Sequence, residues 1–260
     1  MKYEDKYKND KIKFTLLICG IVVVVVVVLV VLLAPSMIET PDPDPTQAPM
    51  TTAEAPGGDF EIEDEALKSA IQEALNIDEI TEQDMERLEV LDCGERVIRS
   101  FEGLQFAVNL RELTAKVDVT TLEPLKNMAI RKLTLSCDYS VQLLMQDISQ
   151  IQSLQVLDLT DCGVTSVGYL TELPHLTELV LDDNKIHYLN YFNSMPFLER
   201  LSLRGCSITS IEDMSGNSTL VYVDLRDNEI MDLSVLDSFL SLEEALTEGN
   251  PEQTPSEELE

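Results

Sequence analysis

Hydrophobic residues recur with a period of 22 along the second half of the chain. Each copy opens with a leucine, and these are Leu154, Leu176, Leu198, Leu220 and Leu242. An apolar residue follows three positions later, and in all but the last copy a leucine follows five positions later. In the first four copies cysteine or asparagine stands at position 9 and valine or isoleucine at position 11. This spacing predicts a short strand that buries positions 4 and 6 and turns positions 5 and 7 outward.

The same pattern extends towards the N-terminus. Three further copies, which are 22, 20 and 24 residues long, begin at Leu88, Leu110 and Ile130. We therefore predict seven repeats over residues 88–241 and a last strand-like piece over residues 242–251. The 20- and 24-residue copies are irregular, because Thr120 and Ser140 replace an aliphatic residue and aspartates replace the asparagine. A local distortion is expected there.

The full pattern is the leucine-rich repeat signature, L-x-x-L-x-L-x-x-N/C-x-L. A single coil of this length cannot bury its leucines alone, whereas stacked coils share one continuous core. The predicted fold class is an α/β leucine-rich repeat solenoid, with a curved parallel sheet on the concave face and short 3₁₀ or loop returns on the convex face. The asparagine of position 9 is expected to satisfy backbone groups at the turn, where cysteine fits the same space.

A different pattern precedes the repeats. Leu67, Ile71 and Leu75 lie four residues apart and predict one apolar helix face over residues 63–75. Thr81 is then a candidate N-cap for a second helix. Because the end of a solenoid core needs a cover, we interpret residues 60–87 as a helical N-terminal cap rather than an independent functional domain.

This region resembles the N-terminal cap of internalin-type bacterial leucine-rich repeat proteins. The matching segments are EALKSAI at 65–71, ITEQDM at 80–85 and FEGLQFAVNL at 101–110. With the repeats, the resemblance covers residues 60–251. It implies a curved solenoid with 3₁₀ turns on its convex side that grips protein partners at a cell surface. Two features depart from better-known members: the C-terminus has no LPxTG-like sorting motif, and few aromatic residues fall on the predicted concave face.

A long apolar segment stands near the start of the chain. Residues 14–34 are 21 residues without a charge, and as a helix they would span roughly 31 Å, enough to cross a bilayer core. Lysines dominate residues 1–13, and the next basic residue after the segment is Lys68. The positive-inside rule therefore predicts a single-pass signal-anchor in a bacterial cell membrane, with residues 1–13 cytoplasmic and the repeats extracellular. Cleavage as a signal peptide and lipid attachment at Cys19 are the alternatives.

Residues 35–59 separate this segment from the cap. They hold six of the eleven prolines and five acids, without lysine or arginine. Such a composition predicts an extended acidic stalk with no core of its own, at most roughly 75 Å long. Residues 252–260 read as a solvated acidic tail.

The charge of the chain narrows the class of partner. The net charge is −30, and because residues 1–13 contribute +2, the remainder carries −32. Nucleic acid is therefore not an expected partner, since phosphate binding relies on clustered lysine and arginine. Solubility and repulsion from an acidic membrane surface explain the charge; a cationic protein partner or a loosely bound Ca²⁺ is the alternative.

The cysteines and histidines form no pattern that predicts a disulfide, a metal site or catalysis. Cys93 and Cys137 fall two repeats apart, as do Cys162 and Cys206, and at about 4.8 Å per strand such pairs are too distant for a disulfide. Free thiols favour a Gram-positive or anaerobic bacterium over an oxidising secretory route. We find no zinc spacing, nucleophile motif or phosphate-binding loop. No enzymatic activity, small-molecule substrate or cofactor is therefore expected.

The outward positions of the strands remain as candidate site residues. The predicted protein-binding residues of the concave face are Asp158, Thr160, Val180, Asp182, Arg200, Ser202, Arg204, Tyr222, Asp224 and Arg226. Tyrosine and arginine are the residue types that dominate binding energy at protein interfaces. The competing interpretation is that acids and arginines pair across neighbouring strands and serve only the sheet. The predicted function is thus non-catalytic protein binding at a cell surface, with a membrane-anchored envelope scaffold as the alternative.

Overall fold

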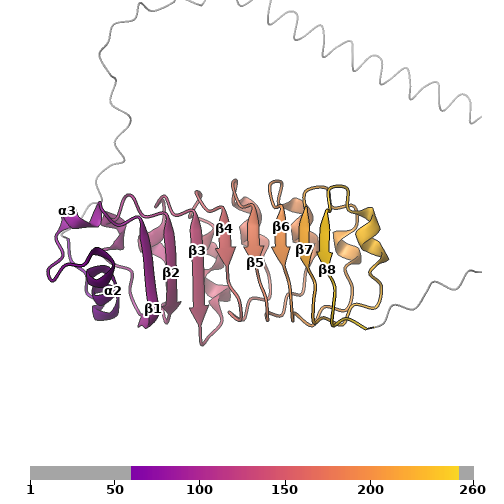
Figure 1. Ribbon diagram of the computed structural model, residues 1–260, viewed down its shortest axis with the longest axis horizontal. Coiled ribbons are helices and arrows are strands. Elements are labelled where there is room, and N and C mark those ends of the chain that lie inside the picture. Colours follow the sequence, from indigo (N-terminus) through magenta and orange to yellow (C-terminus); the bar gives the residue numbers. More distant parts are fainter. Residues whose placement is uncertain (1–59, 252–260) are drawn as a thin grey trace, which may run out of the picture. The chain divides into compact units, whose positions relative to one another are not determined.

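A computed structural model of the chain describes residues 60–251, which form a solenoid of stacked repeats (Figure 1). The predicted cytoplasmic segment, membrane anchor, stalk and acidic tail (residues 1–13, 14–34, 35–59 and 252–260) lie outside these described residues. Within residues 60–251, no helix combines the length and the apolar character needed to cross a membrane.

Eight parallel strands form one sheet in the order of the sequence. They are β1 Val90–Ile98, β2 Glu112–Val117, β3 Lys132–Cys137, β4 Val156–Asp158, β5 Glu178–Val180, β6 Arg200–Ser202, β7 Tyr222–Asp224 and β8 Glu244–Leu246. From β4 onward the register repeats the sequence period, since Leu157 pairs with Leu179 and Leu179 with Leu201. The predicted parallel sheet of a leucine-rich repeat solenoid is confirmed.

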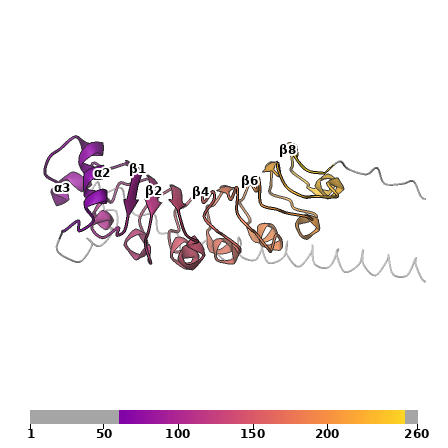
Figure 2. The ribbon, with the colours of Figure 1, turned by 90° about the horizontal axis from the view of Figure 1, so that it is seen from below.

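The returns between strands are short helical turns. Figure 2 shows the strands along the inner side of an arc and the turns along its outer side. The turns are η1 Leu104–Phe106, η2 Glu123–Leu125, η3 Val141–Leu144, α4 Met145–Ile148, η4 Gly168–Glu172, η5 Asn190–Ser194, η6 Glu212–Met214 and η7 Ser234–Ser238. The turns from η1 to η6 each bury an apolar side chain, such as Leu170 or Phe192, in the continuous core between the sheet and the turns, and η7 packs partly buried side chains against that core.

Buried asparagine side chains hydrogen-bond the backbone where the chain turns away from a strand. Asn184 donates to the carbonyls of Leu159 and Leu181 at 2.8 and 2.9 Å, and its Oδ1 accepts from the amide of Val164 at 2.8 Å. In the copies with cysteine at this position, the thiols of Cys162 and Cys206 each donate to one backbone carbonyl of the preceding repeat. These contacts are the physical reason for asparagine or cysteine at position 9.

The expected distortion lies in the central repeats. β2 and β3 pair over six residues, from Glu112–Lys132 to Val117–Cys137, whereas the later strands are three residues long. These repeats have exposed aspartates at position 9, not a buried asparagine or cysteine that binds the backbone of the preceding repeat, and the ladder continues. The register then steps by 20 residues between β2 and β3 and by 24 between β3 and β4.

Two helices cover the N-terminal end of the core. In α2 (Glu65–Leu75) the residues Leu67, Ala70 and Ile71 are buried. The N-cap Asp64 accepts from the Leu67 amide at 2.8 Å, and its second oxygen accepts from the Arg99 amide at 2.7 Å. α3 (Glu82–Met85) starts with a capping box between Thr81 and Asp84. The Asp64 carboxylate therefore joins the start of α2 to the chain that leaves β1.

Candidate functional site

The predicted site residues lie on strands β4–β7 or in the turns directly after them. They fall in three rows across the sheet: Arg200 and Tyr222 at position 3, Asp158, Val180, Ser202 and Asp224 at position 5, and Thr160, Asp182, Arg204 and Arg226 at position 7. Neighbours in a row are brought together by the register, as in the pairing of Ser202 with Asp224.

An arginine–tyrosine stack forms the aromatic part of this surface. The Arg200 guanidinium lies 4.1 Å from the centre of the Tyr222 ring on the next strand. On its other side, Arg200 Nε lies 3.7 Å from Glu178, and the Arg200 side chain remains 49% exposed. Partial burial, followed by the charge of Asp224, raises the pKa of Tyr222, so the phenol is neutral at physiological pH. The stack thus offers a flat, partly exposed cationic and aromatic surface.

A carboxylate–guanidinium pair lies beside the stack. Arg226 donates from Nε to Asp224 Oδ1 at 2.9 Å and from Nη2 to Asp224 Oδ2 at 2.5 Å. Asp224 is only 3% exposed. Burial alone would raise the pKa of Asp224, but the hydrogen bonds and charge of Arg226 outweigh it and hold that pKa below its ordinary value. Asp224 therefore positions Arg226 and is itself covered.

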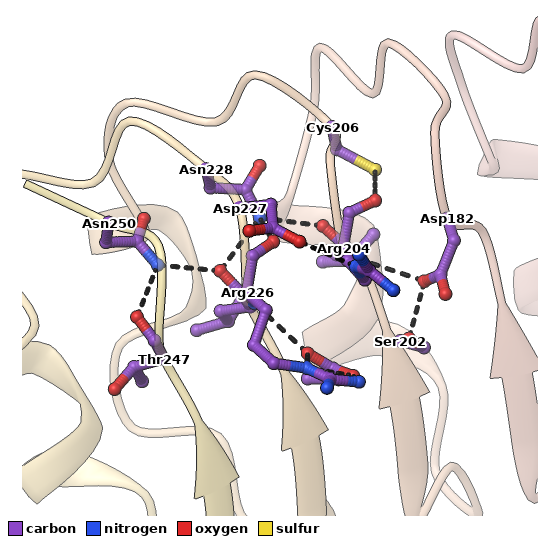
Figure 3. A network of polar contacts seen from close by, with 12 residues as sticks. Asp182, Ser202, Arg204, Cys206, Arg226, Asp227, Asn228, Thr247 and Asn250 are labelled. Atoms are coloured by element: carbon purple, nitrogen blue, oxygen red, sulfur yellow. Dashed lines mark hydrogen bonds and ion pairs between the residues drawn. The ribbon is translucent and has the colours of Figure 1, made fainter.

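A second polar group lies at the ends of β5 to β7 (Figure 3). Asp182 accepts from the Ser202 hydroxyl at 2.5 Å and from the Arg204 backbone amide at 3.0 Å. The Arg204 side chain donates from Nε to Asp227 at 2.7 Å, and this hydrogen bond raises the pKa of Arg204. Arg204 is thus held at both its backbone and its side chain.

The remaining predicted residues make fewer contacts. Asp158 accepts from the backbone amide and the hydroxyl of Thr160 at 3.0 and 2.8 Å. Val180 is half-buried in the middle of the sheet. The acids therefore do not all face arginines of the neighbouring strand: Asp158 binds Thr160, and Asp224 binds the arginine two residues later.

Two residues that hold this surface together stand outside the predicted set. Glu178 occupies an outward position, and its charge opposite Arg200 was a usable signal. Asp227 lies at position 8, beyond the strand, where its left-handed backbone (φ 57°) starts the turn. Its contact with Arg204 of the preceding repeat depends on that turn, so strand alternation could not indicate it.

Groups with catalytic potential were sought over the same residues. In residues 60–251, no cluster of three or more histidine, cysteine or acidic side chains could hold a metal ion. His175 and His187 are both exposed. The arrangement on the sheet is one of paired charges and one stacked ring, which suits surface recognition.

Comparison with known proteins agrees with this class of fold. A family model described as "Leucine Rich repeat" matches residues 150–169 and 216–235. A search of curated proteins found no match. Leucine-rich repeat solenoids generally present extended binding surfaces for proteins.

Among solved structures, the repeat domain is similar to internalin C2 from Listeria monocytogenes. The two are 28% identical with a TM-score of 0.64, over 75% of this chain and 87% of that chain. An internalin (inlF) from the same bacterium is 19% identical with a TM-score of 0.46, over 72% of this chain and 69% of that one. A third similar structure is the leucine-rich repeat ectodomain of the receptor kinase GASSHO1/SCHENGEN3 from Arabidopsis thaliana, solved in complex with CASPARIAN STRIP INTEGRITY FACTOR 2. It is 20% identical with a TM-score of 0.46, over 58% of this chain and 20% of that chain. The described residues thus form an internalin-like leucine-rich repeat domain.

Proposed function

We propose that this chain is a cell-surface protein of a bacterium that binds a protein partner through the concave face of its repeats, without catalysis. Residues 14–34 would anchor it in the membrane with residues 1–13 in the cytoplasm. Residues 35–59 would then hold the repeats away from the membrane as an acidic stalk. The length and charge pattern of these segments support that orientation.

The observation that carries the proposal is the stack of Arg200 on Tyr222. Arginine and tyrosine are enriched among residues whose truncation costs the most binding energy, especially near the centre of an interface. Arg200 is aligned by Glu178, and the ring fixes its plane, so a partner would meet groups that are already ordered. Arg204 and Arg226, each held by an acid, extend the ordered surface beside the stack.

Net charge indicates the kind of partner. The chain carries −30 in total, so a protein with a basic surface would be steered towards it at low ionic strength. The arginines of β6 and β7 would then set orientation at close range rather than attract from a distance.

Site-specific crosslinking in the producing cell tests the proposal. A photo-reactive residue replaces Ser202 on β6 of the full chain, and a matched variant carries it at Glu212 on η6, on the opposite side of the solenoid. We expect a discrete crosslinked protein from position 202 that is absent from position 212, and that is lost on adding Arg200→Ala and Tyr222→Ala. Equal products from both positions would contradict a concave-face site.

One observation favours the scaffold function instead. Arg200, Arg204 and Arg226 each have an acidic partner within the chain, and such pairs can serve the sheet alone. A scaffold requires that deletion of the whole chain alters cell shape while Arg200→Ala and Tyr222→Ala together change nothing. A binding protein requires that the double variant reproduce the effect of the deletion.

A further inference from the structure

Two cysteines of neighbouring repeats lie next to each other at the C-terminal ends of β3 and β4. Cys137 ends β3, and Cys162 stands at position 9 of the following repeat. β3 and β4 pair with a register step of 24 residues, from Lys132–Val156 to Thr134–Asp158, and Cys137 and Cys162 are 25 residues apart in the sequence. The Cys137 Sγ lies 4.0 Å from the carbonyl oxygen of Cys162. Comparing cysteines two repeats apart misses this pair, because its members occupy different positions in adjacent repeats.

The backbone around the pair is tied together. The Val141 amide donates to the carbonyl of Cys162 at 2.9 Å, and the Ser140 hydroxyl donates to the carbonyl of Gly163 at 2.7 Å. The chain that follows β3 is therefore held against the chain that leaves β4. The two thiols stay adjacent without a rearrangement of the fold.

The thiols differ in access. Cys137 is half-buried and donates to the Tyr139 carbonyl at 2.6 Å, whereas Cys162 is fully buried and donates to the Leu135 carbonyl at 3.2 Å. Burial raises the pKa of Cys162, and the neighbouring Cys137 thiol raises it further. Cys137 is thus the thiol that a reagent can reach, and Cys162 is placed to react second.

We propose that Cys137 and Cys162 form a site of reversible oxidation, at which a disulfide joins the third repeat to the fourth. The oxidant is a small-molecule disulfide or a thiol–disulfide oxidoreductase. The Cys137 thiolate, having lost its proton, attacks the oxidant disulfide, forms a mixed disulfide and releases one thiolate. The Cys162 thiol then gives up its proton to the thiolate released in the first step, and its sulfur attacks the Cys137 sulfur and releases the second thiolate. Two thiols of the chain are oxidised, and one disulfide is reduced to two thiols.

The other two described cysteines provide internal controls. Cys93 and Cys206 are buried in different repeats, so an oxidant cannot reach either sulfur in the folded chain as it reaches the half-buried Cys137. Both should resist the same oxidant. A Cys19→Ser background removes the one cysteine outside the described residues.

The test treats the full chain with oxidised glutathione and maps its peptides without reduction. We expect a crosslink between residues 137 and 162, the loss of two free thiols, and reversal by dithiothreitol. The melting temperature should rise by about 5 °C on oxidation, because the bridge closes a chain loop. Cys93→Ser with Cys206→Ser should leave all of this unchanged, and Cys137→Ser should abolish it.

Other outcomes overturn the proposal. These are glutathione retained on Cys137 without the internal crosslink, a crosslink between two chains, or thiols that survive the oxidant in the native state. Because Cys137→Ser changes a half-buried residue, its far-ultraviolet circular dichroism is compared with that of the parent. If that variant fails to fold, the peptide map of the parent chain still decides.

Discussion

At the scale of single residues, one position of the repeat determines how the coils are joined. Asn184 binds a backbone carbonyl of its own repeat, and a carbonyl and an amide of the preceding repeat. Asn228 repeats this arrangement with Leu203, Leu225 and Ile208. Because these groups are buried, they have no water to replace a lost partner, so position 9 is under strong chemical constraint.

We predict that Asn184→Ala lowers the free energy of unfolding by about 3 kcal/mol, because it leaves several buried backbone groups without partners. Asn184→Cys should cost less, since cysteine fills the same position at Cys162 and Cys206. Urea unfolding measures both. Asn190→Ala, at an exposed position of η5, is the control and should stay within about 0.5 kcal/mol. Equal losses from alanine and cysteine at 184 would contradict this account.

A second residue-scale prediction concerns pH. Arg226 holds the pKa of Asp224 below its ordinary value in the folded chain. Asp224 therefore contributes stability that is fully present above about pH 3.9, the unfolded value, and is lost as pH falls through the lowered folded pKa. Asp224→Asn should cost about 1 to 2 kcal/mol at neutral pH, and the difference from the parent should shrink below about pH 4.

Urea unfolding between neutral and strongly acidic pH measures this difference. Asp237→Asn on η7, which has an exposed side chain, is the matched control and should show no such pH dependence. A gap between the parent and Asp224→Asn that stays constant through the acid range would show that the charge of Asp224 is not what stabilises the fold.

The contacts of individual side chains were the part that the sequence predicted least well. Position 5 alternates outward in a strand, yet Asp224 is buried because Arg226 folds over it. Asp227 reaches Arg204 only because the backbone turns left-handed beyond the strand. The leucine pattern predicts on which face of the sheet a side chain lies. Side-chain pairing depends on turn geometry and rotamers, which the pattern does not encode.

At the scale of elements, the central repeats show how a missing cap residue changes a strand. Asp118 and Asp138 stand where the later repeats have asparagine or cysteine, and both are exposed. β2 and β3 therefore continue to Val117 and Cys137 instead of turning inward. The irregular composition predicted the place of the distortion. The form of the distortion, a longer strand ladder followed by a helical turn at α4, could be seen only in the structure.

The helical turn after β3 supplies a matched pair of variants. Met145 is fully buried in the core, while Leu143, two residues earlier, is 90% exposed. Met145→Ala should lower the free energy of unfolding by about 2 to 4 kcal/mol, because it opens a cavity among buried leucines. Leu143→Ala should change it by less than about 0.5 kcal/mol. Similar losses from both variants, measured by urea unfolding, would mean that this turn packs differently.

At the scale of the whole molecule, a constant repeat fixes the fold because every strand must pair with the next at the same spacing. The period of 22 residues was sufficient to predict the parallel sheet and its register from β4 to β8. Burial by stacking then leaves one face of the sheet available, and the array orders Arg200, Tyr222, Arg204 and Arg226 along it. The period says nothing of the partner, because outward residues are free to vary without disturbing the core.

The affinity for the crosslinked partner tests the central claim most directly. The dissociation constant of the full chain is compared with that of the double variant Arg200→Ala, Tyr222→Ala and with that of Leu143→Ala on η3. We predict that the double variant binds at least about tenfold more weakly, since loss of each such anchor typically costs more than 1 kcal/mol, and that Leu143→Ala binds as the parent does. An unchanged affinity in the double variant, with its fold intact, would contradict recognition through the concave face.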